Sequence, residues 1–209
     1  MTTSSRPRGR PRDPVAQAQR EDALLEAATK IFAEHGFRQT DVQWIADALG
    51  VGKGTVYRRY PSKEALFLAT VDNGMRRLTL SVTAGIDEIE DPVEAIAASV
   101  RRYLAFFDAH PEVLELLIQE RAEFKDRPKP TYFEHRDANI DPWRKLVAGL
   151  IRDGRVRRMK VDTVLDVVSH ALYGTIFTDH FVQRRRSFAS RADEILDVIF
   201  HGILTEPYS

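Results

Sequence analysis

The chain has 209 residues, 43% of them hydrophobic and 30% charged, which is ordinary for a soluble globular protein. It contains no cysteine, and this excludes disulfide bonds and thiolate metal sites. No apolar run approaches the length of a membrane span, and the N-terminus lacks the apolar region of a signal peptide, so we expect a cytoplasmic protein without membrane contact.

The charges cancel overall but are unevenly divided along the chain. Residues 1–63 hold 11 Lys and Arg against 7 Asp and Glu, whereas residues 64–209 hold 20 against 24. A basic front end on an acidic body is expected when only one domain meets nucleic-acid phosphates. The first third of the chain is therefore the candidate DNA-binding part.

Residues 1–16 form a polar segment rich in Pro, Arg and Ser, which we expect to be disordered in isolation. Arg8 and Arg10 lie in a Pro-Arg-Gly-Arg-Pro run that resembles an AT-hook, whose arginines enter a narrow A·T minor groove. The alternative is a solvated basic tail that adds only sequence-independent affinity for DNA. Both interpretations assign this arm to double-stranded DNA.

A first helix is expected over 17–35, where apolar residues recur at helical spacing. Its predicted role is structural. Phe32 and Phe37 should pack under Ile45 and Leu49, which lie on the apolar stripe of the helix that follows.

The stretch from Thr40 to Lys63 predicts two short helices joined by a tight turn. Thr40 begins the first of them in a capping box with Gln43. Gly50 then breaks the apolar stripe and supplies the positive φ of a turn. The second helix is expected over 53–60 and ends before a proline. Two short helices with this connection make a helix-turn-helix, whose second helix enters the major groove of DNA.

This stretch, TDVQWIADALGVGKGTVYRRYPSKEAL, closely resembles the DNA-binding signature of the TetR (tetracycline repressor) family. In that signature, T-T-V-x-x-I-A leads into G-V-S-K-G-T-L-Y and then S-K-E-x-L. The chain departs from it at Asp41, where Ser or Thr is usual, and at Gly52, where Ser is usual. With the arginine arm, the motif and the resemblance predict these DNA contacts: Arg8, Arg10, Thr40, Lys53, Gly54, Thr55, Tyr57, Arg58 and Lys63.

A competing interpretation of this segment is a nucleotide-binding loop. GVGKGT, from Gly50 to Thr55, is similar to the phosphate loop of adenylate kinases. A Walker motif needs a glycine separated by four residues from the Gly-Lys pair, and a strand leading into the loop. Asp47 stands at that position and helical spacing precedes it, so we favour the helix-turn-helix. An enzyme that binds ATP through Lys53 is the alternative class.

The sequence after the helix-turn-helix predicts helices alone. Together with the first 63 residues, this indicates an all-α chain of about nine helices, with a helix-turn-helix DNA-binding domain over 17–63 and a helical ligand-binding and dimerisation domain over 64–209. The helices of the second domain are expected over 62–84, 92–109, 111–124, 131–152 with a kink or split around Pro142, 161–184 and 190–204.

The resemblance also implies a small-molecule effector, because members of this family usually release DNA when a ligand binds in the body. Such pockets are largely apolar with a few polar groups, so we expect an apolar or aromatic effector. Ordinary core packing is the alternative for each aromatic residue at helical spacing. The candidate pocket residues are Tyr103, Phe106, Phe107, Trp143, His170, Tyr173 and Phe177.

The last two helices carry more apolar surface than the edge of one small core needs. TetR-like proteins dimerise through these helices as a four-helix bundle, so the resemblance implies a homodimer. Its two recognition helices would reach successive major grooves, about 34–36 Å apart or more. The predicted interface residues are Leu172, Ile176, Ile195, Ile199, Phe200 and Ile203.

Catalysis and metal binding lack a recognisable constellation in this sequence. His170 and His201 each follow an aspartate by one helical turn, a spacing typical of helix-stabilising contacts. We expect no cofactor, no metal and no enzymatic activity. The sequence predicts a ligand-responsive repressor that binds a palindromic operator as a homodimer. The alternative is an architectural protein of A·T-rich DNA without an effector.

Overall fold

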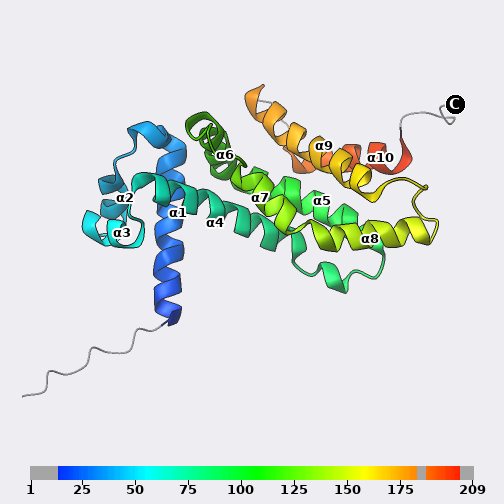
Figure 1. Ribbon diagram of the computed structural model, residues 1–209, viewed down its shortest axis with the longest axis horizontal. Coiled ribbons are helices and arrows are strands. Elements are labelled where there is room, and N and C mark those ends of the chain that lie inside the picture. Colours follow the sequence, from blue (N-terminus) through cyan, green and yellow to red (C-terminus); the bar gives the residue numbers. More distant parts are fainter. Residues whose placement is uncertain (1–13, 183–186, 203–209) are drawn as a thin grey trace, which may run out of the picture.

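The computed structural model describes residues 14–182 and 187–202, and in these residues it holds ten α-helices and no strand (Figure 1). The all-α prediction is confirmed. In chain order the helices are α1 (Pro14–Gln39), α2 (Val42–Ala48), α3 (Lys53–Arg59), α4 (Lys63–Thr83), α5 (Pro92–Ala109), α6 (Pro111–Glu123), α7 (Thr131–Ala138), α8 (Ile140–Arg152), α9 (Val161–Phe181) and α10 (Ala192–His201), with short 3-10 turns at η1 (Ile86–Glu88) and η2 (Ala189–Arg191).

The helices α1, α2 and α3 form one end of an elongated molecule, and α4 runs from them into the helical body (Figure 1). Within the body, α4 packs against α5, α6 and α7. The first helix, α1, packs against both α4 and α6. The candidate DNA-binding end is therefore joined to the body in two ways. The chain continues from α3 into α4, and α1 packs directly against α4 and α6.

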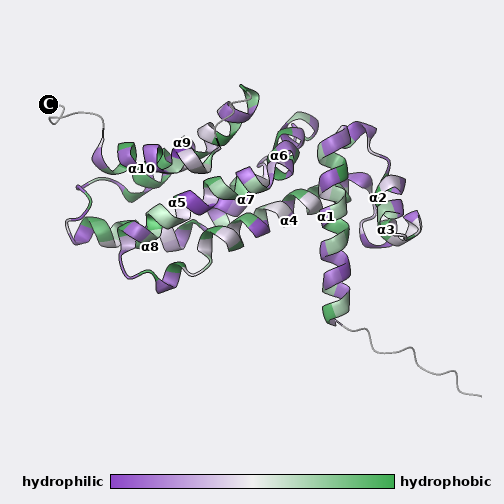
Figure 2. Cartoon of the chain, turned by 180° about the vertical axis from the view of Figure 1, so that it is seen from behind, coloured by the Kyte–Doolittle hydropathy of each residue, from purple (hydrophilic) through white to green (hydrophobic). Residues whose placement is uncertain are grey.

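Most helices alternate hydrophilic and hydrophobic residues along their length (Figure 2), as expected for helices that bury one face. The buried faces join into one apolar core that extends from α1 to α10. At the junction of α1, α4 and α6, phenylalanine rings pack together in this core. Phe32 and Phe67 are both fully buried there, and their ring centroids are 5.1 Å apart. No helix in the described part of the chain is long and apolar enough to cross a membrane.

Several helix boundaries differ from the prediction. The first helix begins at Pro14, so residues 14–16 of the predicted disordered arm belong to α1. The first helix continues past residue 35 to Gln39, although Gly36 interrupts it with a φ of 79°. The region 131–152 divides at Asn139 into α7 and α8, so ten helices replace the expected nine. Pro142 lies in the first turn of α8, where a backbone N–H has no intrahelical acceptor and a proline is tolerated.

Gly74 on α4 lies close to a side chain of α6. A Cβ atom added there would lie 2.9 Å from Cγ1 of Val113, which is fully buried on α6. We predict that Gly74→Ala lowers the free energy of unfolding by about 1 kcal/mol, because overpacking costs about 1–3 kcal/mol and exceeds the gain in helix propensity of about 1 kcal/mol. Chemical denaturation of the variant would measure this difference.

Gly149→Ala on α8 is the matched control, because an added Cβ there meets only Nη2 of Arg152, at 3.7 Å. This variant should be more stable than the wild type by about 0.5–1 kcal/mol, the ordinary helix-propensity gain. Equal gains for the two variants would show that the α4–α6 contact is loosely packed and contradict the prediction.

Candidate functional site

The helices α2 and α3 are joined by a tight turn, as the sequence predicted. Val42, Ile45 and Ala46 are buried on one face of α2. Gly50 has a φ of 65°, and the backbone N–H of Val51 donates to the Ala46 carbonyl at 3.0 Å, which closes the turn. This arrangement directs α3 outward from α1 and α2.

The start of α2 corrects one prediction. The N-cap is Asp41, whose Oδ1 accepts a hydrogen bond from the Gln43 N–H at 2.8 Å. Thr40 is not part of a capping box. Its side chain is 2% exposed, and its hydroxyl donates to the Gly36 carbonyl at 2.7 Å. The Thr40 hydroxyl therefore fastens the end of α1 and does not face the solvent that DNA would displace.

The helix α3 buries one face and exposes the other. Val56 and Tyr60 are buried against α1 and α2 in the core. Most of the predicted DNA contacts of this helix are on the opposite, exposed side; the exposed ones are Gly54, Thr55, Tyr57 and Arg58. The Tyr57 side chain is 37% exposed, and its hydroxyl makes no hydrogen bond within the described part of the chain. These donors are available to phosphate oxygens and base edges.

The end of α3 is held by a contact that the sequence analysis missed. Glu21 on α1 accepts hydrogen bonds from Nη2 of Arg59 at 2.6 Å and from the Tyr60 hydroxyl at 3.0 Å. The Arg59 hydrogen bond lowers the pKa of Glu21, whereas burial, followed by the contact with Glu21, raises the pKa of Tyr60 to about 12. No local pattern predicts a contact between residues 38 positions apart.

Lys63 lies where the prediction places it, at the start of α4, but its ammonium group has partners within the chain. Its Nζ donates to the carbonyls of Arg38 at 3.0 Å and Thr40 at 3.1 Å, and it lies 4.9 Å from the ring centre of Phe37. A lysine has three N–H donors. One donor is therefore left for a phosphate, while two stabilise the end of α1.

Lys53 also has a partner within the chain. Its Nζ lies 2.5 Å from Oδ1 of Asp41, so the first residue of α3 is paired with the N-cap of α2. Of the remaining predicted DNA contacts, Arg8 and Arg10 lie outside the described residues. The DNA-facing residues that the structure brings together thus come from α3 and from the start of α4.

The nucleotide-loop interpretation lacks its structural context. GVGKGT spans the turn between α2 and α3, and the element before it is a helix. A phosphate loop of the Walker type follows a strand. Residues 14–182 and 187–202 contain neither a strand nor a cluster of three His, Asp or Glu side chains arranged to hold a metal ion.

Five of the seven predicted pocket residues lie in one aromatic part of the body. Tyr103, Phe106 and Phe107 are buried on α5, and Tyr173 and Phe177 lie partly buried on α9 with ring centroids 4.3 Å apart. The two helices are linked through a residue that the sequence analysis did not single out.

That residue is Tyr132 on α7. Its ring lies 4.8 Å from Tyr173, and its hydroxyl is 3.0 Å from that of Tyr103. Burial raises the pKa of Tyr132 to about 12 and that of Tyr103 well above its usual range. Trp143 and His170 do not belong to this cluster: Trp143 is half-buried on α8, and His170 is exposed on α9.

The predicted dimer interface needs a correction. Leu172 and Ile176 are buried in the core of the chain and present no surface to a partner. Ile195 and Ile199 are half-buried on α10, Phe200 is 39% exposed, and Ile203 lies outside the described residues. Large apolar side chains that the prediction omitted are exposed on the same two helices: Val167 and Phe181 on α9, and Val198 on α10.

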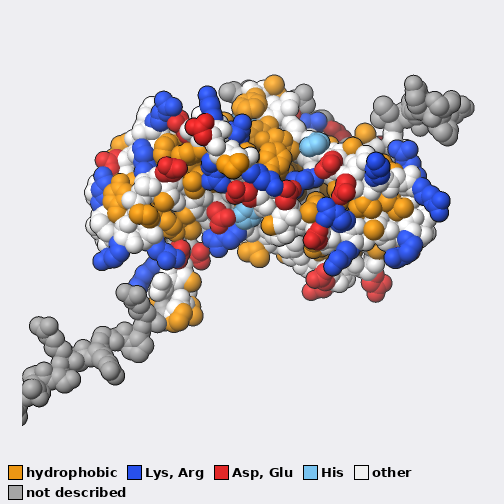
Figure 3. Space-filling model, in the orientation of Figure 1, with side chains coloured by type: hydrophobic (Ala, Val, Ile, Leu, Met, Phe, Trp, Pro, Cys, Tyr) orange, Lys and Arg blue, Asp and Glu red, His pale blue; other side chains and the backbone are white. Residues whose placement is uncertain are grey.

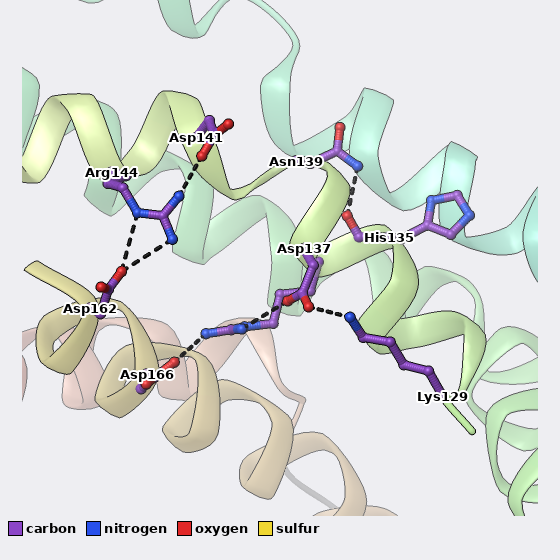
Figure 4. A network of polar contacts seen from close by, with 9 residues as sticks. Lys129, His135, Asp137, Asn139, Asp141, Arg144, Asp162 and Asp166 are labelled. Carbon is purple, nitrogen blue, oxygen red and sulfur yellow. Dashed lines mark hydrogen bonds and ion pairs between the residues drawn. The ribbon is translucent and has the colours of Figure 1, made fainter. Parts of the chain in front are cut away.

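Polar contacts attach α9 to α7 and α8 (Figure 4). Arg136 on α7 pairs with Asp166 on α9 at 2.5 Å, and Arg144 on α8 pairs with Asp162 on α9 at 3.1 Å. These side chains line a polar hollow of about 410 Å³ on the surface of the body. Because these aspartates pair with these arginines, the hollow is lined by a surface network of ion pairs.

Together these features define a helix-turn-helix DNA-binding protein with a helical body. Residues 24–70 match the family model described as bacterial regulatory proteins, tetR family. The chain belongs to the TetR family of transcriptional regulators. The resemblance of the recognition segment is thus confirmed by the comparison of whole chains.

Two relatives and one solved structure illustrate the similarity. The HTH-type transcriptional repressor SCO4008 of Streptomyces coelicolor is 31% identical over 153 residues, 73% of this chain and 72% of the repressor. The HTH-type transcriptional regulator EthR of Mycolicibacterium smegmatis is 26% identical over 200 residues, 93% of this chain and 86% of EthR. FadR of Bacillus subtilis, solved in complex with stearoyl-CoA, has a TM-score of 0.73 at 16% identity, over 88% of this chain and 100% of FadR.

The Glu21 contact predicts a pH-dependent contribution to stability. Glu21 has a pKa below its ordinary value of 4.5, so its contribution is complete above that pH and is lost as the pH falls through the lower folded value. Glu21→Gln should therefore unfold more easily than the wild type at pH 7, by about 0.5 kcal/mol, with a difference that shrinks below about pH 4. Denaturation from pH 7 to pH 3 measures it.

Glu26→Gln is the matched control on the same helix, because Glu26 pairs only with Lys30 on an exposed face at 3.1 Å. Its effect at pH 7 should be smaller, because an exposed pair one turn apart on a helix contributes little. A Glu21→Gln difference that persists unchanged to pH 3 would contradict the assigned role of the carboxylate.

Proposed function

We propose that this regulator is a ligand-responsive repressor that binds a two-fold-symmetric operator as a homodimer. The observation that carries the proposal is the exposed face of α3, with Thr55, Tyr57 and Arg58 projecting from a helix whose other face is buried. Such a helix fits the major groove, where side chains reach both base edges and phosphates. The basic residues of this end then meet the phosphate backbone.

The exposed apolar residues on α9 and α10 support the homodimer. Phe181 is 65% exposed and Val198 is 51% exposed, and hydrophobic side chains gather on the visible surface over α9 (Figure 3). Exposed apolar side chains that cluster on one face mark interaction sites. In the proposed dimer the same two helices of a second copy cover this face.

The aromatic cluster of the body supports an apolar or aromatic effector. Tyr103 and Tyr132 place two hydroxyls 3.0 Å apart among buried rings, and Tyr173 packs against Tyr132. An apolar surround with a few polar groups is the usual lining of a small-molecule site. FadR of Bacillus subtilis holds stearoyl-CoA, so this acyl thioester is a reasonable first probe.

In the proposed mechanism, the effector favours a state in which α4 holds the two DNA-binding ends at the wrong spacing. The contacts of α4 with the body support this route. His135 on α7 lies beside Tyr132 in the turn of helix that faces α4, and its Nε2 is 2.7 Å from Oδ1 of Asp72 on α4. A ligand that displaces the Tyr132 ring moves α7, and α7 is bonded to α4.

Footprinting on the DNA that flanks the gene, across a series of salt concentrations, tests the proposal. Protection of a two-fold-symmetric site with a steep salt dependence is the expected result. Protection spread over A·T-rich tracts without symmetry would instead support an architectural role. If no duplex DNA is bound at low salt, the proposed function fails. On a protected site, stearoyl-CoA and other apolar ligands can then be screened for release.

Tyr57→Phe should weaken binding to every duplex sequence by about the same factor. The predicted role of the Tyr57 hydroxyl is a hydrogen bond to phosphate, which carries no sequence information and contributes about 1 kcal/mol, or roughly fivefold in affinity. Titrations against the protected site and against single-base variants of it measure the effect. A change in the order of preferred sites would assign Tyr57 to base recognition instead.

Val198→Glu should shift the protein from dimer to monomer, because the variant places a charge in the apolar face of α10. Sedimentation velocity measures the shift. Leu80→Glu is the matched control, because Leu80 is 69% exposed on α4, outside the proposed interface. The control should remain dimeric, and a dimeric Val198→Glu variant would contradict the assigned interface.

A further inference from the structure

Asp41 and Lys53 form an ion pair at the surface that the proposed function brings to DNA. Asp41 precedes α2 and Lys53 begins α3, so the pair bridges the two helices of the helix-turn-helix. Oδ1 of Asp41 accepts hydrogen bonds from the Gln43 N–H at 2.8 Å and from Nζ of Lys53 at 2.5 Å. Both side chains are solvent-accessible: that of Asp41 is 51% exposed and that of Lys53 is 36% exposed.

The carboxylate of Asp41 is ionised at neutral pH. The hydrogen bond from the Gln43 backbone, followed by the one from Lys53, lowers its pKa below the ordinary value, and the contact with Asp41 raises the pKa of Lys53. The pair uses one of the three N–H donors of Lys53 and neutralises its charge, so a phosphate that approaches this ammonium group meets a compensated charge. A carboxylate at the same surface also repels phosphates.

We propose that Asp41 is a specificity-determining residue that restrains sequence-independent binding to DNA by occupying the ammonium group of Lys53. A lysine contact with phosphate strengthens binding to all duplexes alike, because release of counterions does not depend on the bases. Pairing Lys53 inside the protein removes this contribution from every non-cognate site. The inference rests on the proposed DNA-binding function and assigns a role to one carboxylate within it.

Asp41→Asn is the direct test. Asparagine is as good an N-cap as aspartate, so the hydrogen bond from Gln43 and the fold are retained, as a thermal melt can verify. The probe is a duplex of arbitrary sequence, titrated between 50 and 200 mM salt. The variant should bind it more tightly than the wild type at 50 mM. The ratio of the variant's affinity to the wild-type affinity should fall by about threefold per subunit between 50 and 200 mM salt, because each lysine released from its ion pair adds about 0.9 to the salt slope.

Asp47→Asn is the matched control. Asp47 lies on the exposed side of α2 and accepts from Nε2 of Gln43, at 2.6 Å, without contacting Lys53. The Asp47→Asn variant removes one negative charge from the same helix-turn-helix but leaves the Asp41–Lys53 pair intact. An equal gain in affinity for Asp47→Asn would show that net charge alone is responsible and would overturn the proposal.

A double-mutant cycle isolates Lys53. Lys53→Gln should weaken binding to the arbitrary duplex less in the wild-type background than in the Asp41→Asn background, where it should return the salt slope to the wild-type value. Weaker binding by Asp41→Asn would mean that the carboxylate positions Lys53 for DNA, which also overturns the proposal. If the wild type and Asp41→Asn bind arbitrary duplex equally, the restraint is absent while the DNA-binding function stands. If neither binds any duplex, that function itself has failed.

Discussion

The phenylalanine rings at the junction of α1, α4 and α6 constrain the rest of the structure. The ring of Phe37 lies 5.2 Å from that of Phe67 on α4 and 4.9 Å from that of Phe124, which directly follows α6. Close-packed rings cannot separate without opening a cavity, and removing a buried phenylalanine side chain costs about 3–5 kcal/mol. The DNA-binding end is therefore held to the body at this junction, and a movement of α6 must carry α1 with it.

Two polar contacts reinforce the same junction. Nε2 of Gln119 donates to the Phe32 carbonyl at 2.9 Å, and Arg38 pairs with Glu123 at 2.7 Å. Both link α6 to α1. The body thus contacts the DNA-binding end directly, in addition to its covalent connection through α4, as the proposed ligand-driven mechanism requires.

The cations beside α3 share a common property: each has a partner within the protein. Lys53 pairs with Asp41, Arg59 with Glu21, and Lys63 with two backbone carbonyls. Binding to DNA must therefore exchange or share these partners instead of simply adding contacts. The net affinity is the difference between two sets of interactions, and its dependence on sequence rests on residues that begin without a charged partner, such as Tyr57.

The sequence predicted the elements well because helix periodicity and glycine positions are local properties. The turn at Gly50 and the helix 92–109 follow from residues within one or two turns. The errors arose where several choices satisfy the local rule. Thr40 and Asp41 are adjacent and both suit an N-cap, and only the backbone path selects Asp41.

The interface and the site contacts were less predictable for a related reason. Periodicity indicates that Leu172 and Ile176 are buried, but it does not indicate whether their own chain or a second copy buries them. Contacts such as Glu21 with Arg59 join positions far apart in the sequence and leave no local signal. Resemblance to a family supplied the general location of the DNA contacts, whereas their partners within the protein required the structure.

The ion pairs that attach α9 to α7 and α8 have a consequence for the proposed dimer. An apolar contact that opens loses its packing, but an exposed ion pair that opens is largely compensated by hydration. The pair of Arg144 with Asp162, whose side chains are 45% and 72% exposed, can therefore open at small cost, whereas Arg136, which is 22% exposed, holds Asp166 more firmly (Figure 4). In the proposed dimer, α9 can therefore tilt at small cost where it contacts α8, while the packing of Tyr173 on Tyr132 holds it against α7.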